Sequence, residues 1–310
     1  MAAKNISDNS FAKINRVSPA TNAVLSVLFT IVAVVTVLPI VLVFMISITT
    51  PDSLTHRGFS FFPESITFTS YEGLFKTGSQ IVDSYIATIG MTLCSTALGL
   101  LIMAMFAYVL SNPRFGARRF YTIILFITMM FSGGLVPGYI INVNYLHLYD
   151  TFWILVLASM VNQFYIIVLR TFISTTIPID MMDAAQIDGA NEFQIFTRIV
   201  LPLAKAGLAT VALFIMVTKW NDWFVGMLYI DNPKLVPLQT MLTRIQQKID
   251  FIKNNSSLAS TPDGMAMLKA MPTEQTRMAI VVVSTVPILF AYPFFQRYFI
   301  QGLTIGSVKG

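Results

Sequence analysis

The sequence has little charge and almost no cysteine, and each shortage excludes a class of protein. Only 11% of its 310 residues are charged, whereas soluble domains carry charge on roughly a quarter of their residues. The single cysteine, Cys94, can form no intramolecular disulfide and no cysteine-based metal site. A soluble globular protein and a cysteine-based redox protein are therefore excluded.

Catalytic and nucleotide-binding patterns are also missing. The string nearest to a G-x-x-x-x-G-K-[ST] phosphate loop, Gly302 to Lys309, has the wrong spacing, so we expect no ATP hydrolysis by this chain. His56 and His147 stand alone in predicted loops, which makes a metal site improbable. We therefore predict no catalytic residue, no metal and no cofactor bound by the chain. The net charge of +5 is scattered in short loops, which argues against a nucleic-acid partner.

The main feature of the sequence is its long apolar runs. It is 55% hydrophobic with a mean hydropathy of +0.71, as expected of an integral membrane protein. Each apolar run can hold a membrane span of about 20 residues, although the fifth is interrupted by Lys219 and Asp222. The first run is too long for a signal-peptide core. We predict an all-α membrane protein with six transmembrane helices, at 22–48, 84–110, 119–141, 151–173, 203–230 and 278–297.

Positive charge sets the expected orientation. Arg114, Arg118 and Arg119 follow the second helix, and no Lys or Arg follows the third. Because positive loops stay inside, both termini should be cytoplasmic. The chain then divides into a tail (1–21), the transmembrane domain (22–297) and a C-terminal tail (298–310). An inner loop covers 174–202, and an outer loop covers 231–277, whose six basic residues run against the rule but are accompanied by acids.

Loop 174–202 carries an unusual polar segment, "PIDMMDAAQIDGANEFQIFTRIVLP" from residue 178. Pro178 suits the first turn of a helix, and Gly189 allows a break before a second one. In that second helix Phe193, Phe196, Ile199 and Val200 recur at helical spacing. Two short helices meeting at a glycine could dock in a groove of a cytoplasmic partner. Amphipathicity alone favours the other interpretation, in which the segment lies on the lipid headgroups.

The same segment resembles the "EAA" loop of binding-protein-dependent ABC importer permeases. That pattern is E-A-A, three residues, G, nine residues, I, one residue, L-P. The chain matches every spacing, with Asp in place of the first Glu, at Asp183, Ala184, Ala185, Gly189, Ile199, Leu201 and Pro202. The resemblance implies that loop 174–202 is the coupling loop, which inserts into an ATPase subunit.

The end of the chain carries a second resemblance. "FIQGLTIGSVKG" is similar to the last residues of the maltose-type permease of the carbohydrate uptake subfamily, through Gly302, Leu303, Thr304, Gly306, Val308, Lys309 and Gly310. The resemblance implies that this tail reaches the ATPase dimer interface. Without it, a glycine-rich terminus would be read as frayed.

Together the two resemblances imply a type I ABC importer permease fold, with a permease core at about 81–293 in a bacterial cell membrane. The implied partners are a second homologous permease, two cytoplasmic ATPase subunits with their ATP and Mg, an extracellular solute-binding protein and a saccharide, most simply an oligosaccharide. A secondary carrier or a membrane-embedded enzyme remains the alternative. A carrier would usually show internal repeats and midplane charges.

Three further features each leave two interpretations open. The first is the group Trp220, Asn221, Asp222 and Trp223, which in one interpretation lines the outer part of a sugar path. In the other interpretation, the two tryptophans form an interfacial aromatic belt beside a Lys219 that extends to the membrane surface. The glycines in 132–138 either bend the third helix or permit close helix packing. By analogy with the maltose permease, loop 231–277 contacts the solute-binding protein; otherwise it is a mobile surface loop.

Overall fold

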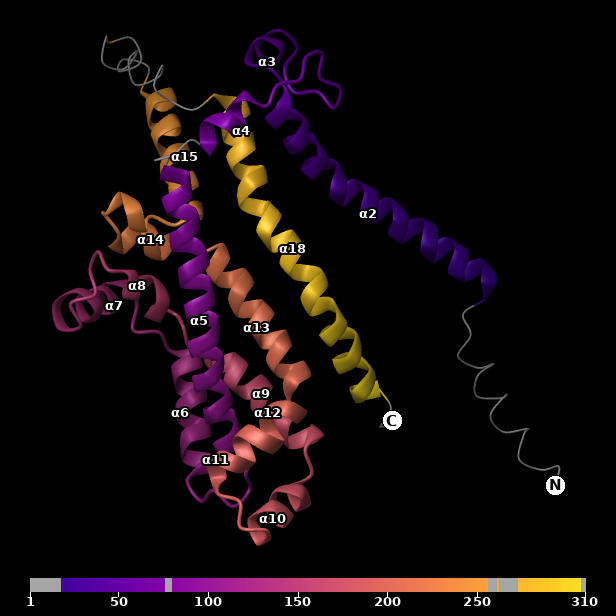
Figure 1. Cartoon of the computed structure of the whole chain (residues 1–310), viewed down its shortest axis with the longest axis vertical. Coiled ribbons are helices and arrows are strands. Elements are labelled where there is room, and N and C mark those ends of the chain that lie inside the picture. The colour runs from indigo at the N-terminus through magenta and orange to yellow at the C-terminus, as the bar shows by residue number, and fades with distance from the viewer. Residues whose placement is uncertain (1–17, 76–79, 256–260, 262–272, 308–310) are drawn as a thin grey trace. The chain divides into compact units, whose positions relative to one another are not determined.

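The computed structural model describes residues 18–75, 80–255, 261 and 273–307 (Figure 1). The described residues are 79% helical, and the only β-type pairing among them is one bridge between Thr49 and Ile66. The all-α prediction is therefore confirmed. The chain forms two compact units, Met1–Ser70 with Pro272–Val282, and Tyr71–Met271 with Val283–Gly310.

The first unit contains the helix α2 (Pro19–Ile48), followed by α3 (Pro51–Arg57). Ser18 caps α2 by accepting a hydrogen bond from the Thr21 backbone N–H at 3.1 Å, and Pro19 occupies the first turn, where its missing N–H costs nothing. The apolar side chains of α2 are exposed along most of its length. This helix matches the predicted span 22–48.

The second unit is built around α5 (Gln80–Ser111), which packs against α9 (Gln163–Thr176) and α13 (Lys205–Trp220). A Cβ added to Gly99 would lie 2.6 Å from the Met160 carbonyl oxygen, so only glycine allows this approach. The core of the unit joins these three helices to loop 174–202, through buried residues that include Met103, Leu169 and Val211.

The predicted third span, 119–141, is not one straight helix. It divides into α6 (Arg118–Met130), α7 (Leu135–Ile140) and a π-helical turn, η1 (Ile141–Tyr145), with a bend of 110°. Gly134 supplies the left-handed backbone at the bend, with φ +88°. The bent interpretation of the glycines in 132–138 is therefore confirmed. Within the described residues, no atom lies close enough to Gly134 or Gly138 to support the packing interpretation.

The predicted fourth and fifth spans are interrupted too. The fourth, 151–173, divides into α8 (Phe152–Leu157) and α9, separated by an irregular stretch at 158–162. The fifth, 203–230, consists of α13 and α14 (Phe224–Tyr229), and α13 is bent by 80° from the preceding helix. By length and composition, the described part of the chain holds two spanning helices, or up to five if each bent pair counts as one. The predicted six remains a prediction.

Further helices lie in and after loop 231–277. A 3-10 turn, η3 (Pro233–Leu235), leads into α15 (Leu238–Asn254), so part of this loop is helical as its pattern predicts. Arg244 of α15 donates hydrogen bonds to the carbonyl oxygens of Gly226 and Ile230 and so caps the end of α14. The last helix, α18 (Glu274–Ser307), is longer than the predicted 278–297.

Candidate functional site

Loop 174–202 folds as two helices that meet at Gly189. The first is α10 (Ile179–Ile187), and the second is a continuous run of α11 (Glu192–Ile195), the π-helical turn η2 (Phe196–Val200) and α12 (Leu201–Leu203). Gly189 has φ +84°, a conformation that costs glycine little. Asn191 and Gln194 form a reciprocal capping box at the start of α11, with both hydrogen bonds at 2.9 Å. Pro178 is the cap of α10, one residue before its first turn.

The inner face of this loop is part of the protein core. Met182, Ile195, Phe196 and Val200 are buried in the same cluster as residues of α5 and α9. Burying each such side chain contributes roughly 1.5–3 kcal/mol. The loop is thus held firmly against the helices above it.

Phe193 departs from the predicted apolar face. It is 71% exposed, whereas Phe196 and Val200 are buried and Ile199 is half-buried. The π-helical turn explains the difference, because its wider repeat changes which positions share a face. The prediction assumed a regular α-helix, and for Phe193 it was wrong.

The outer face of the loop presents apolar side chains. Ile187 is 86% exposed, and Met181 and Phe193 are also exposed. Exposed apolar side chains of this size on a well-packed helical pair suit a contact surface for another protein. Of the other matched positions, Ala184 and Pro202 are exposed, while Ala185 and Leu201 pack partly against the core.

Two acidic side chains fasten the loop to the end of α5. Asp183 of α10 pairs with Arg114, which follows α5, at 2.6 Å. Glu192 of α11 accepts hydrogen bonds from the Tyr108 hydroxyl at 2.5 Å and from the Gln186 side chain at 2.8 Å. The carboxylate of Asp183 is therefore already paired within the chain, with Arg114. The sequence analysis had used Arg114 only to predict the orientation of the chain in the membrane.

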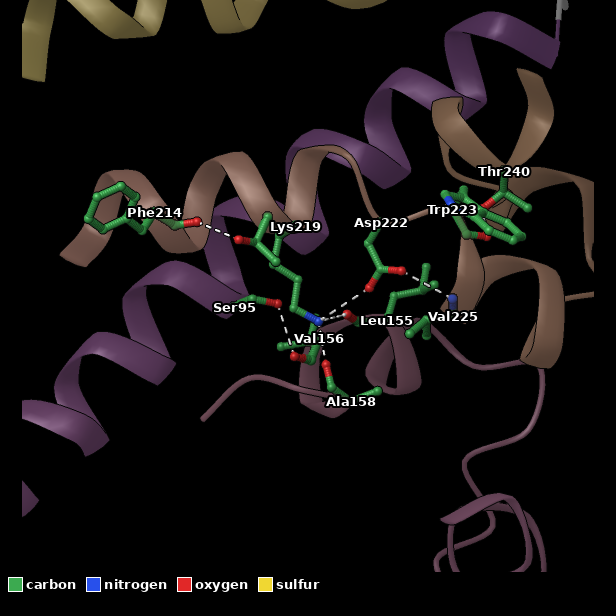
Figure 2. A network of polar contacts seen from close by, with 11 residues as sticks. Ser95, Leu155, Val156, Ala158, Phe214, Lys219, Asp222, Trp223, Val225 and Thr240 are labelled. Carbon is green, nitrogen blue, oxygen red and sulfur yellow. Dashed lines mark hydrogen bonds and ion pairs between the residues drawn. The ribbon is translucent and has the colours of Figure 1, made fainter. Parts of the chain in front are cut away.

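The second predicted site lies where α13 ends, and it contains a buried cation (Figure 2). Lys219 is 2% exposed, and its Nζ donates to the carbonyl oxygens of Leu155, at 3.1 Å, and Ala158, with Asp222 at 3.9 Å. The interpretation in which Lys219 extends to the membrane surface is wrong. Because α8 ends at Leu157, its last carbonyls lack helical partners, and a cation at a helix C-terminus is favourable.

The α8 terminus receives a further bond from α5. The Ser95 hydroxyl donates to the Val156 carbonyl oxygen at 2.9 Å (Figure 2). Three helices thus contribute to one interruption, since α5 supplies Ser95, α13 supplies Lys219, and α8 supplies the carbonyls. This arrangement makes a broken span tolerable inside a membrane protein, where unpaired backbone groups are costly.

The four predicted path residues have different surroundings. Trp220 is buried, and its indole N–H donates to the Ser284 carbonyl oxygen at 2.9 Å. The Asn221 side chain donates to Val217 in its own helix and remains exposed, as does the Trp223 ring. The Asp222 carboxylate accepts the Val225 backbone N–H at 3.2 Å. Only Asn221 and Trp223 present substantial accessible surface.

Sequence reasoning missed the polar surface at the interruption of the fourth span. Ser159 is exposed with φ +56°, a strained value for a residue other than glycine. Asn162 is exposed and caps α9 by accepting the Phe164 backbone N–H at 2.9 Å. The signal was present as three polar residues, Ser159, Asn162 and Gln163, inside an otherwise apolar run.

Two sets of predictions involve the chain end and metals. Gly302, Leu303, Thr304 and Gly306 lie in the last turns of α18, and Lys309 is outside the described residues. Across 18–75, 80–255, 261 and 273–307, no group of three His, Cys, Asp or Glu side chains is placed to hold a metal ion.

Comparison with known proteins gives consistent matches along the chain. Residues 84–305 match the family described as "Binding-protein-dependent transport system inner membrane component". The protein LplC of Bacillus subtilis is 36% identical over 280 residues, covering 90% of this chain and 91% of LplC. A polygalacturonan/rhamnogalacturonan transport system permease protein, YtcP, from the same organism is 32% identical over 278 residues, covering 90% and 94%. A chain from the crystal structure of a bacterial ABC transporter involved in the import of the acidic polysaccharide alginate superposes with a TM-score of 0.76 at 29% identity, covering 96% of this chain and all of that one.

Proposed function

Since this chain belongs to the family of binding-protein-dependent transport system inner membrane components, we propose that it forms half of the translocation path of an ATP-driven saccharide importer. The other half is a second, homologous permease. Two ATPase subunits bind ATP and Mg on the cytoplasmic side, and a solute-binding protein delivers the saccharide from outside. The family is one of ABC transporter membrane components, with the ATPase a separate subunit, which disfavours the carrier and the membrane-embedded enzyme.

The substrate we propose is an oligosaccharide. Relatives are named for polygalacturonan/rhamnogalacturonan and for arabinooligosaccharides, and the structural neighbour takes part in alginate import. The substrates in these names are all carbohydrate chains of several sugar units, and they differ in charge. The proposal therefore commits to chain length and leaves the charge of the sugar to experiment.

The observation that carries the proposal is the geometry of loop 174–202. Its outer face exposes Ile187, Phe193 and Met181, and its inner face is buried in the core. An ATPase that binds the outer face will move the whole loop as a rigid body, together with the helices packed against it. ATP can drive the change only by favouring one conformation over the other. The residues matched to the coupling pattern, Asp183 to Pro202, form the framework of this docking surface.

We place the translocation path at the interruption between α8 and α9 and at the turn after α13. Ser159 and Asn162 are polar and exposed in the first, and Asn221 and Trp223 in the second. Such groups are unfavourable against lipid and suit a water-accessible surface. Hydroxyl groups of a sugar suit the polar side chains, and its C–H faces suit Trp223. Trp220 and Asp222 support this surface from behind.

The proposed topology completes the assignment. Six spans place both termini and loop 174–202 in the cytoplasm, and the exposed apolar side chains of α2 contact lipid or the second permease. Loop 231–277, with α15, faces outward and contacts the solute-binding protein. The end of α18 and Lys309 contact the ATPase pair.

The test is co-purification from the native membrane with Ile187→Asp as the probe. Ile187 is almost fully exposed, so its replacement removes no contact within the chain. Phe62→Asp, at a residue 84% exposed in the first unit, is the matched control. We expect wild type and F62D to retain a second permease and an ATPase, and I187D to lose the ATPase. Wild-type protein that takes up saccharide without any ATPase would refute the proposal in favour of a carrier.

A further inference from the structure

We propose that Tyr108, acting through Glu192, is the positioning residue that makes loop 174–202 move together with α5. The inference rests on the proposed function, in which this loop receives the motion of the ATPase. It adds a specific route by which that motion reaches α5, a helix that does not adjoin the loop in the sequence.

The geometry brings three helices to one carboxylate. Tyr108 lies in the last turn of α5 and is 7% exposed. Its hydroxyl donates to one oxygen of Glu192, which is the first residue of α11. The other oxygen accepts the Gln186 amide of α10 at 2.8 Å. The Tyr108 ring also packs against Phe196, with centroids 5.5 Å apart. Removal of the hydroxyl alone would break this polar link between α5 and both loop helices while keeping the ring contact.

The chain bends sharply at both ends of the loop, where the loop joins the neighbouring helices. α9 leads into α10 through a bend of 76°, and the second loop helix leads into α13 through a bend of 80°. Bends of this kind at element ends can act as hinges. Because the apolar contacts of the loop with α5 and α9 are not directional, a loop moved by the ATPase could rotate about both hinges while it stays packed. The bond between Tyr108 and Glu192 opposes that rotation.

The neighbouring ion pair is less suited to this role. Arg114 and Asp183 have side chains 60% and 28% exposed, and exposed pairs are weak and screened by salt. Tyr108 is buried, and its partly buried hydroxyl bond has a charged acceptor, which gives a stronger bond. We therefore assign the main positioning role to Tyr108 and a minor one to Arg114.

The consequence extends to the opposite end of α5. There the Thr88 hydroxyl accepts the backbone N–H of Leu238, the first residue of α15, at 2.9 Å. Figure 1 shows α10 and α15 at opposite ends of α5. One helix thus contacts both the loop proposed to bind the ATPase and the loop proposed to bind the solute-binding protein. Motion of α5 is a direct route between them.

The experiment compares Y108F with Y121F in the complete complex, reconstituted in lipid vesicles with its ATPase and solute-binding protein. Tyr121 is the matched control, because it contacts Phe106 and Phe115 on α5 and the loop after it through its ring, and its hydroxyl lies outside the Glu192 network. The readouts are subunit stoichiometry, basal ATP hydrolysis, and saccharide transported per ATP hydrolysed. We expect Y108F to keep the subunit stoichiometry and the basal ATP hydrolysis of wild type. It should lower the saccharide transported per ATP about tenfold, because losing one hydrogen bond to a charged group changes an equilibrium by about this factor.

A second variant, E192Q, keeps the inference testable if Y108F is poorly folded, because Glu192 is exposed and its replacement leaves the core intact. We expect a smaller loss of transport per ATP, and a double variant no worse than Y108F alone. Unchanged transport per ATP in a well-assembled Y108F complex overturns the inference. So does loss of the ATPase from that variant, which would make Tyr108 merely structural. If the proposed function itself is wrong, wild type and Y121F will also lack ATP-dependent uptake.

Discussion

Replacement of Lys219 by methionine is the most informative perturbation of the interrupted fourth span. Methionine has a similar length and fills the same volume, so the change removes the ammonium group and little packing. It leaves the Leu155 and Ala158 carbonyl oxygens without their donor and removes the cation facing Asp222. No other residue is changed at the site.

The magnitude follows from these lost partners. A buried acceptor left without a partner costs about 1–3 kcal/mol, and breaking one side of a buried ion pair costs about 3–5 kcal/mol. Asp222 retains its bond from the Val225 backbone, so its contribution should be small. We therefore expect a loss of about 4 kcal/mol in stability, dominated by the two carbonyls.

The assay is thermal unfolding of the purified complex in lipid nanodiscs. At roughly 2–4 °C per kcal/mol for a chain of this class, K219M should lower the Tm by about 10 °C. Lys205→Met is the control, because Lys205 begins the same helix and is exposed. The double variant K219M/D222N should recover only a small part of the loss, because the two carbonyl groups still lack their donor. A Tm for K219M within about 2 °C of wild type would contradict the reasoning.

Three other substitutions test separate contacts. G99A should lower stability by about 1–3 kcal/mol, because its methyl group would overlap the Met160 carbonyl oxygen, as thermal unfolding will show. R114A should cost less than about 1 kcal/mol and should lose even this effect at high salt, because its ion pair is exposed. The hydrogen bond to Asp231 raises the pKa of Tyr149 above its ordinary value; its contribution is therefore complete below about pH 10 and is lost as the pH rises through the raised pKa. Ultraviolet difference titration of wild type against Y149F should show one tyrosine ionising late.

Each of these tests has its own control or contrary result. For G99A the control is G116A, since a Cβ at Gly116 meets nothing within 4 Å; equal stability of the two variants would contradict the contact. For R114A, a large loss that persists in high salt would show that the pair is stronger than its exposure allows. For Tyr149, ionisation at the ordinary tyrosine pKa would show that the bond to Asp231 does not form in solution.

Sequence reasoning succeeded where one local property decides the structure. The spans 22–48 and 84–110 are long, apolar and uncharged, and α2 and α5 follow them within a few residues. Loop 174–202 was predicted as two helices meeting at Gly189 because a glycine between amphipathic runs marks a break. These outcomes depend on neighbouring residues alone.

It failed where distant residues supply missing hydrogen bonds. Hydropathy made 151–173 one continuous helix, whereas Ser95 and Lys219, from two other helices, satisfy the carbonyls of a broken one. The same partnership explains why Lys219 is buried and not at the membrane surface. Such tertiary capping leaves no periodic signal in the segment that it interrupts. The π-helical turn that exposes Phe193 likewise has no counterpart in a regular helical pattern.

The partnership between α8 and Lys219 also imposes an order on biosynthesis. Lys219 follows Leu155 by 64 residues, so at about 5–20 residues per second the ribosome delivers the cation roughly 3–13 seconds after the carbonyls. Ser95 is made before α8 and can bind the Val156 carbonyl at once. Until Lys219 is made, the carbonyl groups of Leu155 and Ala158 need other donors, from water or from the insertion machinery. The interruption after α8 therefore stays incompletely hydrogen-bonded until α13 is made, and variants of Lys219 should be recognised by quality control before assembly is complete.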